Sequence, residues 1–184
     1  MRRMRAFTLP ELLGVLLILG MLLGIGIPAF ADFTGRTRAN SAMFQLRGLL
    51  HLARSSAITL RRDVTLCGTV DGSSCSAEWN ELPALAFLDE NLDRRLNDSE
   101  RLILRSEQTR SANLRWQGSG GRAYLRYRPD GGIREFGHFL YCPVSGDPRH
   151  ARKLVINATG RPREARDADG NGIIDELQGS NSCP

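Results

Sequence analysis

Lysine is almost absent from this chain of 184 residues. Of its 25 basic residues 24 are arginines, and Lys153 is the only lysine. Guanidinium groups bind carboxylates and phosphates in a planar, two-pronged geometry, so the composition favours anionic partners of these kinds. A high-GC genome also enriches arginine, and this alternative explanation involves no partner.

Signatures of catalysis are missing as well. The three histidines, His51, His138 and His150, have no catalytic triad pattern beside them, and the chain has no phosphate-binding glycine loop. None of the four cysteines forms a C-x-x-C pair, which excludes the common zinc and redox motifs. The length also excludes a large multidomain enzyme, and the 41% hydrophobic content lies above the disordered range. We expect a non-enzymatic protein of about one domain.

The cysteines are even in number, with Cys67 and Cys75 close together and Cys142 and Cys183 far apart. The first two flank an Asp71-Gly72 turn and could close a hairpin. Cys142 and Cys183 would tie the C-terminal residues to a strand. We predict these two disulfides, which require an oxidising compartment; four free buried thiols are the alternative.

The N-terminus directs the chain to a membrane. Residues 1–6 contain three arginines, and the following segment 7–30 carries no charge apart from Glu11. As a helix, this segment would be about 36 Å long and could cross the ~30 Å hydrocarbon layer once. The arginine cluster would stay on the cytoplasmic side, so that the rest of the chain faces outward.

Two interpretations of this segment compete. The sequence Pro28-Ala29-Phe30-Ala31 ends in a small-x-small pattern that signal peptidase could cut before Asp32. Glu11 argues against removal, because a carboxylate in lipid costs about 2.5 kcal/mol or more and has no purpose in a discarded peptide. Glu11 is therefore a functional candidate.

The residues around Glu11 carry a family resemblance. The sequence Ala6-Phe7-Thr8-Leu9-Pro10-Glu11 resembles the processing site of type IV pilins and type II secretion pseudopilins. The resemblance implies that prepilin peptidase removes the leader, residues 1–6, and that the new N-terminal Phe7 is methylated. Glu11 would then neutralise the α-amino group of Phe7 on a neighbouring subunit during assembly. Ala6 and Pro10 depart from the usual glycine and aliphatic residue; proline is compatible with the first turn of a helix.

The remaining chain predicts one long helix followed by strands. Residues 31–62 repeat apolar side chains at spacings of three and four, which predicts an amphipathic helix that continues the membrane helix. Residues 63–184 contain short β-type runs between turn residues. We therefore expect an α+β fold in which the long N-terminal helix packs on antiparallel β-sheet. The predicted strands are Val64–Cys67, Leu85–Leu88, Leu102–Leu104, Ala123–Arg128, Phe139–Cys142 and Leu154–Asn157.

Several segments from residue 53 onward narrow the family resemblance to the FimT/FimU minor pilins and protein H of the general secretion pathway. The resemblance to these proteins extends from the leader to about Arg163. It implies a pilin-like fold and a non-enzymatic subunit, anchored in the inner membrane with a periplasmic globular domain. The subunit would then assemble with other pilins or pseudopilins. The matching segments are Ala53–Ile58, Val64–Cys67 with Cys75 and Trp79, Phe87–Asp89, Leu154–Asn157 and Thr159–Arg163.

Residues 149–166 form a basic segment with six basic residues against the single acid Glu164. Within the family, a Gly-Arg-x-Arg element is linked to DNA capture in natural transformation, and it stands here at residues 160–163. Glycine permits a tight turn, proline stiffens it, and an extended segment would send both arginines to the same side. We expect contacts to DNA phosphates; the alternative is a basic face that contacts neighbouring pilins. The expected DNA-binding residues are Gly160, Arg161, Arg163, Arg152 and Lys153.

Residues 167–175 resemble the start of a calcium loop. Oxygen-bearing side chains stand at its first, third, fifth and ninth positions and glycine at its sixth, but Gln178 replaces the glutamate expected at the twelfth. Such a loop would bind calcium weakly, and an acidic turn is the alternative. A weaker match extends from Asp89 to Glu100, with Arg94 at the glycine position. The ligands in the first loop would be Asp167, Asp169, Asn171 and Asp175.

Three functions are consistent with these features. The first is a minor pilin of the FimT type, assembled in a type IV pilus, that binds extracellular DNA for uptake. The second is a pseudopilin of the protein H type in the pseudopilus tip of a type II secretion system, which would contact secreted proteins. The third is a secreted calcium-binding structural protein, released by cleavage before Asp32.

The mature protein is expected to begin with N-methylated Phe7, because the motif around Glu11 predicts cleavage after Ala6. Mass spectrometry of the N-terminal peptide measures this directly. A mature N-terminus at Asp32 would contradict the pilin interpretation altogether.

Overall fold

The computed structural model describes residues 9–76, 79, 84–106, 113–175 and 183. The chain divides into two compact units, Met1–Thr37 and Arg38–Pro184. The division falls within a single helix, α1 (Leu9–Leu60), so each unit contains a part of it. Ala6 and Phe7, where processing is predicted, lie outside the described residues.

The first unit contains the apolar part of α1. By length and composition, this helix could cross a membrane, and none of its most apolar window is buried. Pro28 lies inside the helix, which continues through it. Glu11 is exposed in the first turn, where the unpaired N–H groups of a helix favour a carboxylate. Asp32 and Arg36, one turn apart, form an ion pair with a nitrogen–oxygen distance of 3.0 Å.

The second unit begins with the amphipathic part of α1. The helix ends at Leu60 because Arg61 adopts a left-handed backbone with φ +53°. The N–H of Arg62 then bonds the carbonyl of Ala57 at 3.3 Å, as in a Schellman motif. The predicted apolar stripe is confirmed, since the buried residues of the helix recur at spacings of three and four. They are Ala39, Met43, Leu46, Leu50, Ala53 and Ala57.

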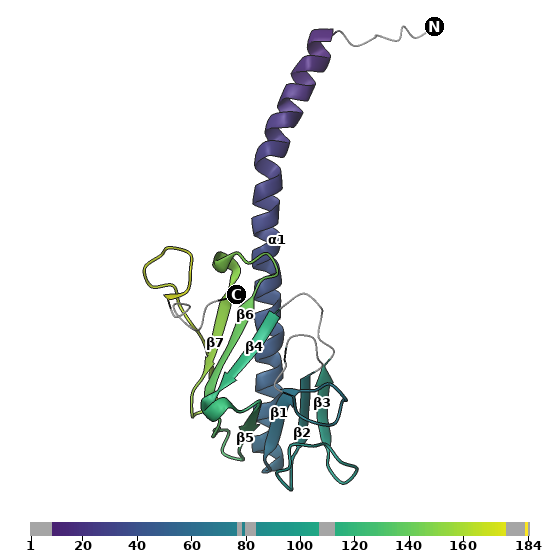
Figure 1. Ribbon diagram of the computed structural model, residues 1–184, viewed down its shortest axis with the longest axis vertical. Coiled ribbons are helices and arrows are strands. Elements are labelled where there is room, and N and C mark those ends of the chain that lie inside the picture. Colours follow the sequence, from purple (N-terminus) through teal and green to yellow (C-terminus); the bar gives the residue numbers. More distant parts are fainter. Residues whose placement is uncertain (1–8, 77–78, 80–83, 107–112, 176–182, 184) are drawn as a thin grey trace, which may run out of the picture. The chain divides into compact units, whose positions relative to one another are not determined.

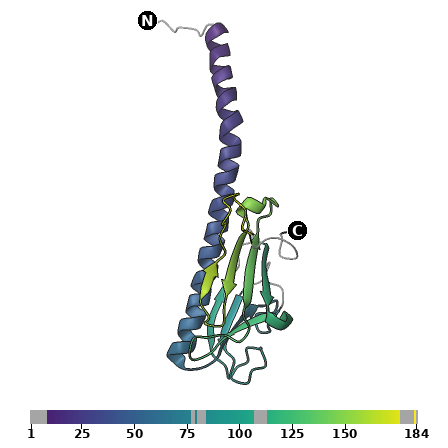
Figure 2. The same ribbon diagram turned by 90° about the vertical axis from the view of Figure 1, so that its left-hand side faces the viewer.

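Two four-stranded antiparallel sheets lie alongside this part of α1 in both views (Figure 1, Figure 2). The first has the strand order β3-β2-β1-β5 and the second the order β4-β6-β7-β8. The first consists of β1 (Val64–Gly68), β2 (Ala84–Leu88), β3 (Leu102–Ser106) and β5 (Tyr124–Tyr127). The second consists of β4 (Asn113–Gly118), β6 (Gly137–Cys142), β7 (Arg152–Ile156) and β8 (Pro162–Glu164). Two short 3-10 helices, η1 (Ser119–Gly121) and η2 (Pro148–His150), lie in the connections.

One large hydrophobic cluster joins the helix to both sheets. Trp79 is buried, and its ring meets that of Phe139 on β6 edge-on, with centroids 4.9 Å apart. Trp116 on β4 lies 4.6 Å from the same ring. The Trp79 indole N–H donates to the carbonyl of Ala123 at 3.2 Å, so its one polar atom is satisfied inside the core.

The predicted strands are confirmed, with small shifts at their ends, but β4 and β8 were not predicted. On β5, Leu125 and Tyr127 are buried and Tyr124 and Arg126 are half-exposed, which is the alternation of a strand with one face in the core. The α+β class is therefore the one predicted.

Both predicted disulfides are present. Cys67 pairs with Cys75 and Cys142 with Cys183, and no cysteine is free. The second bridge ties the penultimate residue to β6. Cys183 packs there against a smaller hydrophobic cluster of Leu140, Cys142, Ala151, Ala165 and Ile174.

The two bridges are expected to stabilise the fold unequally, because they join residues 8 and 41 positions apart. Loop-closure entropy gives about 2.5 kcal/mol for the shorter loop and about 3.9 kcal/mol for the longer one. The double variant C142S/C183S should therefore lose more free energy of unfolding than C67S/C75S. Urea unfolding of the full chain in dodecyl maltoside, followed by tryptophan fluorescence, measures both losses. The opposite order would contradict this account.

Candidate functional site

The basic element begins at a turn that only glycine fits. Gly160 has φ +72°, and a Cβ there would lie 2.2 Å from the carbonyl oxygen of Gly131. The Tyr127 hydroxyl donates to the Gly160 carbonyl at 3.3 Å. Burial raises the pKa of Tyr127, against the opposing charge of Arg54, so the hydroxyl keeps the proton it donates. Gly131 and Tyr127 therefore fix the turn through their contacts with Gly160, and the sequence analysis did not connect them to this element.

Arg161 and Arg163 follow this turn, and both are exposed on either side of half-buried Pro162. Pro162 opens β8, the edge strand of the second sheet, and Arg163 stands opposite Val155 of β7. Among the described residues, Arg161 has no ion-pair or hydrogen-bond partner. The structure thus brings the two predicted arginines together on one short, exposed element.

Lys153 does not belong to this surface, and its prediction as a DNA contact is wrong. Only 6% of the residue is exposed. It stands opposite Leu140 of β6, and its carbonyl accepts from the N–H of Ala165, so that buried residues flank it on both sides. Arg152, half-exposed, donates to the carbonyls of Arg149 and Ala151 at 3.0 and 2.8 Å.

Two further charges of the basic segment are paired. Arg149 donates to the Asp147 carboxylate from two guanidinium nitrogens, and the shortest nitrogen–oxygen distance is 2.7 Å. Hydrogen bonds from Arg149 lower the pKa of Asp147 to about 2, so this pair stays ionised at any physiological pH. Glu164, the one acid of the segment, forms an ion pair with Arg47 of α1. Arg166 is exposed.

The C-terminal acidic loop brings three carboxylates together. Asp167, Asp169 and Asp175 place carboxylate oxygens within 4.8 Å of one another. Asp167 accepts from the N–H groups of Gly170 and Gly172 at 2.8 and 2.7 Å. The side-chain oxygen of Asn171 accepts from the N–H of Ile173 at 2.7 Å. These oxygens could hold a hard cation such as calcium, but Gln178 lies outside the described residues, so the calcium site stays a prediction.

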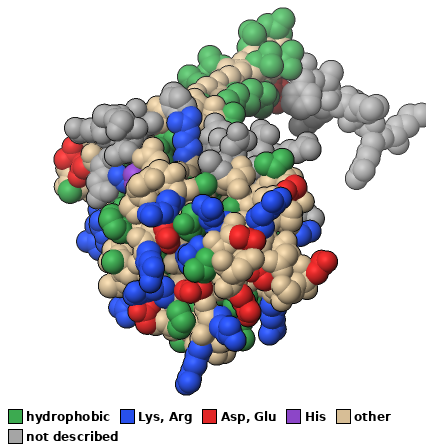
Figure 3. Space-filling view, turned by 60° about the horizontal axis from the view of Figure 1, so that its bottom comes forward, with side chains coloured by type: hydrophobic (Ala, Val, Ile, Leu, Met, Phe, Trp, Pro, Cys, Tyr) green, Lys and Arg blue, Asp and Glu red, His purple; other side chains and the backbone are tan. Residues whose placement is uncertain are grey.

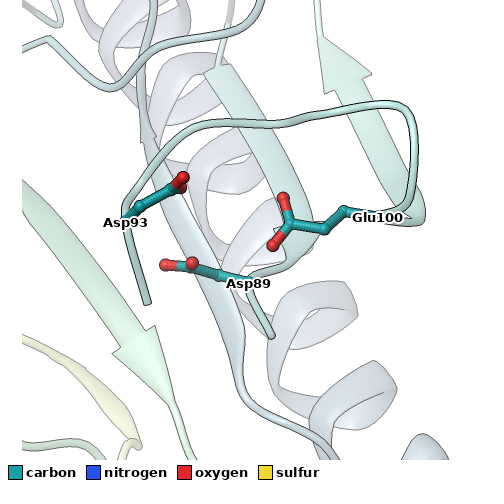
Figure 4. A group of neighbouring side chains, drawn as sticks. All are labelled: Asp89, Asp93 and Glu100. Carbon is teal, nitrogen blue, oxygen red and sulfur yellow. The ribbon is translucent and has the colours of Figure 1, made fainter. Parts of the chain in front are cut away.

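A second acidic loop, residues 89–100, is closer to a calcium loop than its sequence indicates. Asp89, Asp93 and Glu100 converge from its two ends (Figure 4), with oxygens within 4.8 Å. Glu100 stands at the twelfth position, and it accepts from the N–H groups of Glu90 and Asn97 at 3.0 and 3.3 Å. Arg94, at the glycine position, has the left-handed φ of +65° that glycine would supply.

The charge of Asp89 is already matched within the protein. Asp89 is fully buried, and it accepts from the Thr65 hydroxyl at 2.7 Å and from the Arg126 guanidinium at 3.4 Å. The backbone N–H of Arg126 donates to a carboxylate oxygen of buried Glu135 at 3.3 Å. A cation in this loop would have to share Asp89 with Arg126, so the internal ion pair competes with metal binding.

Gly160→Ala is expected to destabilise the protein more than Gly146→Ala. Both glycines have φ +72°, but nothing lies within 4 Å of a Cβ built at Gly146. The control change should cost about 1–2 kcal/mol of backbone strain, and Gly160→Ala about 1–3 kcal/mol more for displacing Gly131. Urea unfolding of the full chain in dodecyl maltoside measures both. Equal losses would show that the turn is not held as tightly as described.

The comparisons with known proteins identify a family. The family model described as "Type II transport protein GspH" matches residues 42–160, from the buried stripe of α1 to the turn at Gly160. Arg161 and Arg163 follow directly after this range, so the family match itself gives them no role. No curated protein sequence matches the chain.

Two solved structures of one protein resemble this chain. The type IV minor pilin FimU of Pseudomonas aeruginosa strain PAO1, in space group P21, is 21% identical with a TM-score of 0.53; the match covers 73% of this chain and 92% of FimU. FimU in space group P65 is 19% identical with a TM-score of 0.46, covering 69% and 92%. The first likeness shows that the fold is that of a pilin. Together with the match over residues 42–160, it establishes that the chain belongs to the GspH family, whose pilin-like members are structural subunits and not enzymes.

Proposed function

We propose that this protein is a minor pilin of the FimT type that binds extracellular DNA through Arg161 and Arg163 for uptake in natural transformation. The observation that carries the proposal is the Gly160 turn, whose conformation is fixed and which is followed by two exposed arginines. Because the backbone of the turn is already fixed, binding a phosphate costs less conformational entropy.

The charges on the element support phosphate as the ligand. The nearest acid, Glu164, is engaged by Arg47 of α1, so it does not neutralise the neighbouring arginines. Arg166 is exposed three residues after Arg163, and half-exposed Arg152 lies on the neighbouring strand β7 at the same end, whereas Lys153 does not take part because it is buried. Because no tryptophan or tyrosine is interleaved with these residues, the expected contacts are to the backbone of DNA and independent of its base sequence.

Membrane anchoring and assembly belong to the same proposal. Prepilin peptidase removes residues 1–6, and the apolar part of α1 holds the subunit in the inner membrane with its globular unit in the periplasm. Glu11 stands exposed in the first turn of α1, where it can reach a neighbouring subunit. A carboxylate at this position neutralises the partner's α-amino group in an apolar bundle, which ties assembly to one register.

The runner-up function is a pseudopilin of the type II secretion system. The description of the matching family, a type II transport protein, favours it. In that machine the exposed arginines would contact neighbouring pseudopilins or secreted proteins and not DNA. DNA binding by the protein therefore separates the two functions.

Replacing Arg161 and Arg163 with alanine is expected to weaken DNA binding and to reduce its salt dependence. If both arginines contact phosphates, the slope of log affinity against log salt should fall by about 1.8, about 0.9 for each lost contact. The measurement is fluorescence anisotropy of labelled duplexes with the full chain in dodecyl maltoside, at a series of NaCl concentrations. Unrelated duplex sequences should be affected alike.

The matched control is R101A/R115A, which removes two exposed arginines from other parts of the second unit and changes the net charge equally. It should leave the slope nearly unchanged. A wild-type protein that ignores DNA at low salt, or equal slopes in the two double variants, would favour the secretion function.

A further inference from the structure

A groove of about 590 Å³ lies against the half-exposed face of β5, away from the Gly160 turn. Three arginines line it, Arg94 and Arg95 from the loop after β2 and Arg122 from the segment before β5. Ser74, Tyr124 and Asp93 complete its polar lining. Its volume is in the range of sites that hold small ligands or a few side chains.

The walls of this groove are held by bonds between distant segments. The N–H of Cys75 donates to the carbonyl of Arg94 at 3.1 Å, and that of Leu96 to the carbonyl of Ser73 at 2.7 Å. The disulfide between Cys67 and Cys75 fastens this contact to the end of β1. The loop that carries Arg94 and Arg95 is therefore fixed at both of its sides.

Arg94 occupies its place at a cost in backbone energy. Its φ of +65° lies in the left-handed region, where a side chain with a Cβ is strained and glycine is not. Its guanidinium lies over the ring of Tyr124, 5.6 Å from the centroid, and Arg126 lies 5.3 Å from the same centroid.

The arginines of the groove have no carboxylate partner among the residues that the structure describes. Asp93 accepts from the Asn91 side chain and from the N–H of Arg95, both at 2.8 Å. Within the described part of the chain, it forms no ion pair with the guanidiniums of the groove. Asp71, beside the groove, accepts from the hydroxyl and N–H of Ser74, and these bonds lower its pKa. Arg94, Arg95 and Arg122 thus line one groove, and because no described carboxylate neutralises their guanidiniums, their charge is available to a ligand.

We propose that this groove binds acidic side chains presented by another protein. Guanidinium groups bind carboxylates in a two-pronged geometry, and three of them at one groove fit a short run of aspartate or glutamate. The surroundings favour a protein over a nucleic acid. Residues 89–101 carry five carboxylates and three arginines, and Arg62 pairs with Glu90 at 3.5 Å.

Charges of both signs are interspersed over the end of the globular unit where α1 stops (Figure 3). In residues 89–101 carboxylates outnumber arginines, which disfavours a polyphosphate chain that crosses this surface, whereas a protein surface can present a complementary mixture. This interaction does not depend on the DNA proposal, because the groove and the Gly160 turn share no residue.

The test uses fluorescein-labelled hexaglutamate and the full chain in dodecyl maltoside, with EDTA present so that no divalent cation bridges peptide and protein. Hexaglutamate should bind, and R94A/R122A should bind it at least about tenfold more weakly than wild type. The controls R101A/R115A and R161A/R163A, which remove the same charge elsewhere, should bind within about twofold of wild type. Equal losses in all three double variants would overturn the proposal, since they would show a general charge effect.

Unlabelled oligothymidylate and hexaglutamate then compete for the groove. Hexaglutamate should displace the labelled peptide; stronger displacement by oligothymidylate, abolished in R94A/R122A, would assign the groove to nucleic acid and overturn the proposal. Urea unfolding shows whether R94A/R122A folds. If it does not, Arg95→Ala replaces it, because no described contact of the fold involves the Arg95 side chain, and it should bind about threefold more weakly. Wild-type affinity in Arg95→Ala would then contradict the proposal.

Discussion

The packing of one helix face against two sheets is the constraint on which the globular unit depends. Three of the six buried residues on that face are alanines, at positions 39, 53 and 57, and small side chains let the strands approach the helix closely. The same helix also reaches the candidate DNA surface. Arg54 donates to the carbonyl of Gly131, which holds the Gly160 turn, and Arg47 pairs with Glu164 on β8. The position of the arginines is thus set by the helix.

Local patterns in the sequence predict most of this fold. The helix stripe is visible because a period of three to four persists over many residues, and six strands stand out as apolar runs between turn residues. β4 has only Leu114 and Trp116 among polar neighbours, and β8 has three residues and starts with proline. A strand as polar as β4 or as short as β8 forms because a neighbouring strand offers it hydrogen bonds, and the sequence does not show that neighbour.

The candidate surfaces show the same limit. The exposure of Arg161 and Arg163 and the glycine requirement at position 160 follow from the residues themselves. The burial of Lys153 does not, because the buried residues that flank it come from β6 and from the chain after β8. The arginine groove was likewise unpredictable, since a disulfide and two backbone bonds bring together segments from three parts of the chain.

Pro162 has a consequence for how the second sheet ends. Arg163 stands opposite Val155, and Ala165 donates back to Lys153, so the N–H groups of odd-numbered residues face β7 and position 162 faces outward. Proline has no N–H to present at this outer margin, and the strand is only three residues long. The margin therefore offers almost no template for a further strand. In a filament, where subunits stand at very high local concentration, this protects the sheet from joining that of a neighbour and restricts contacts there to side chains.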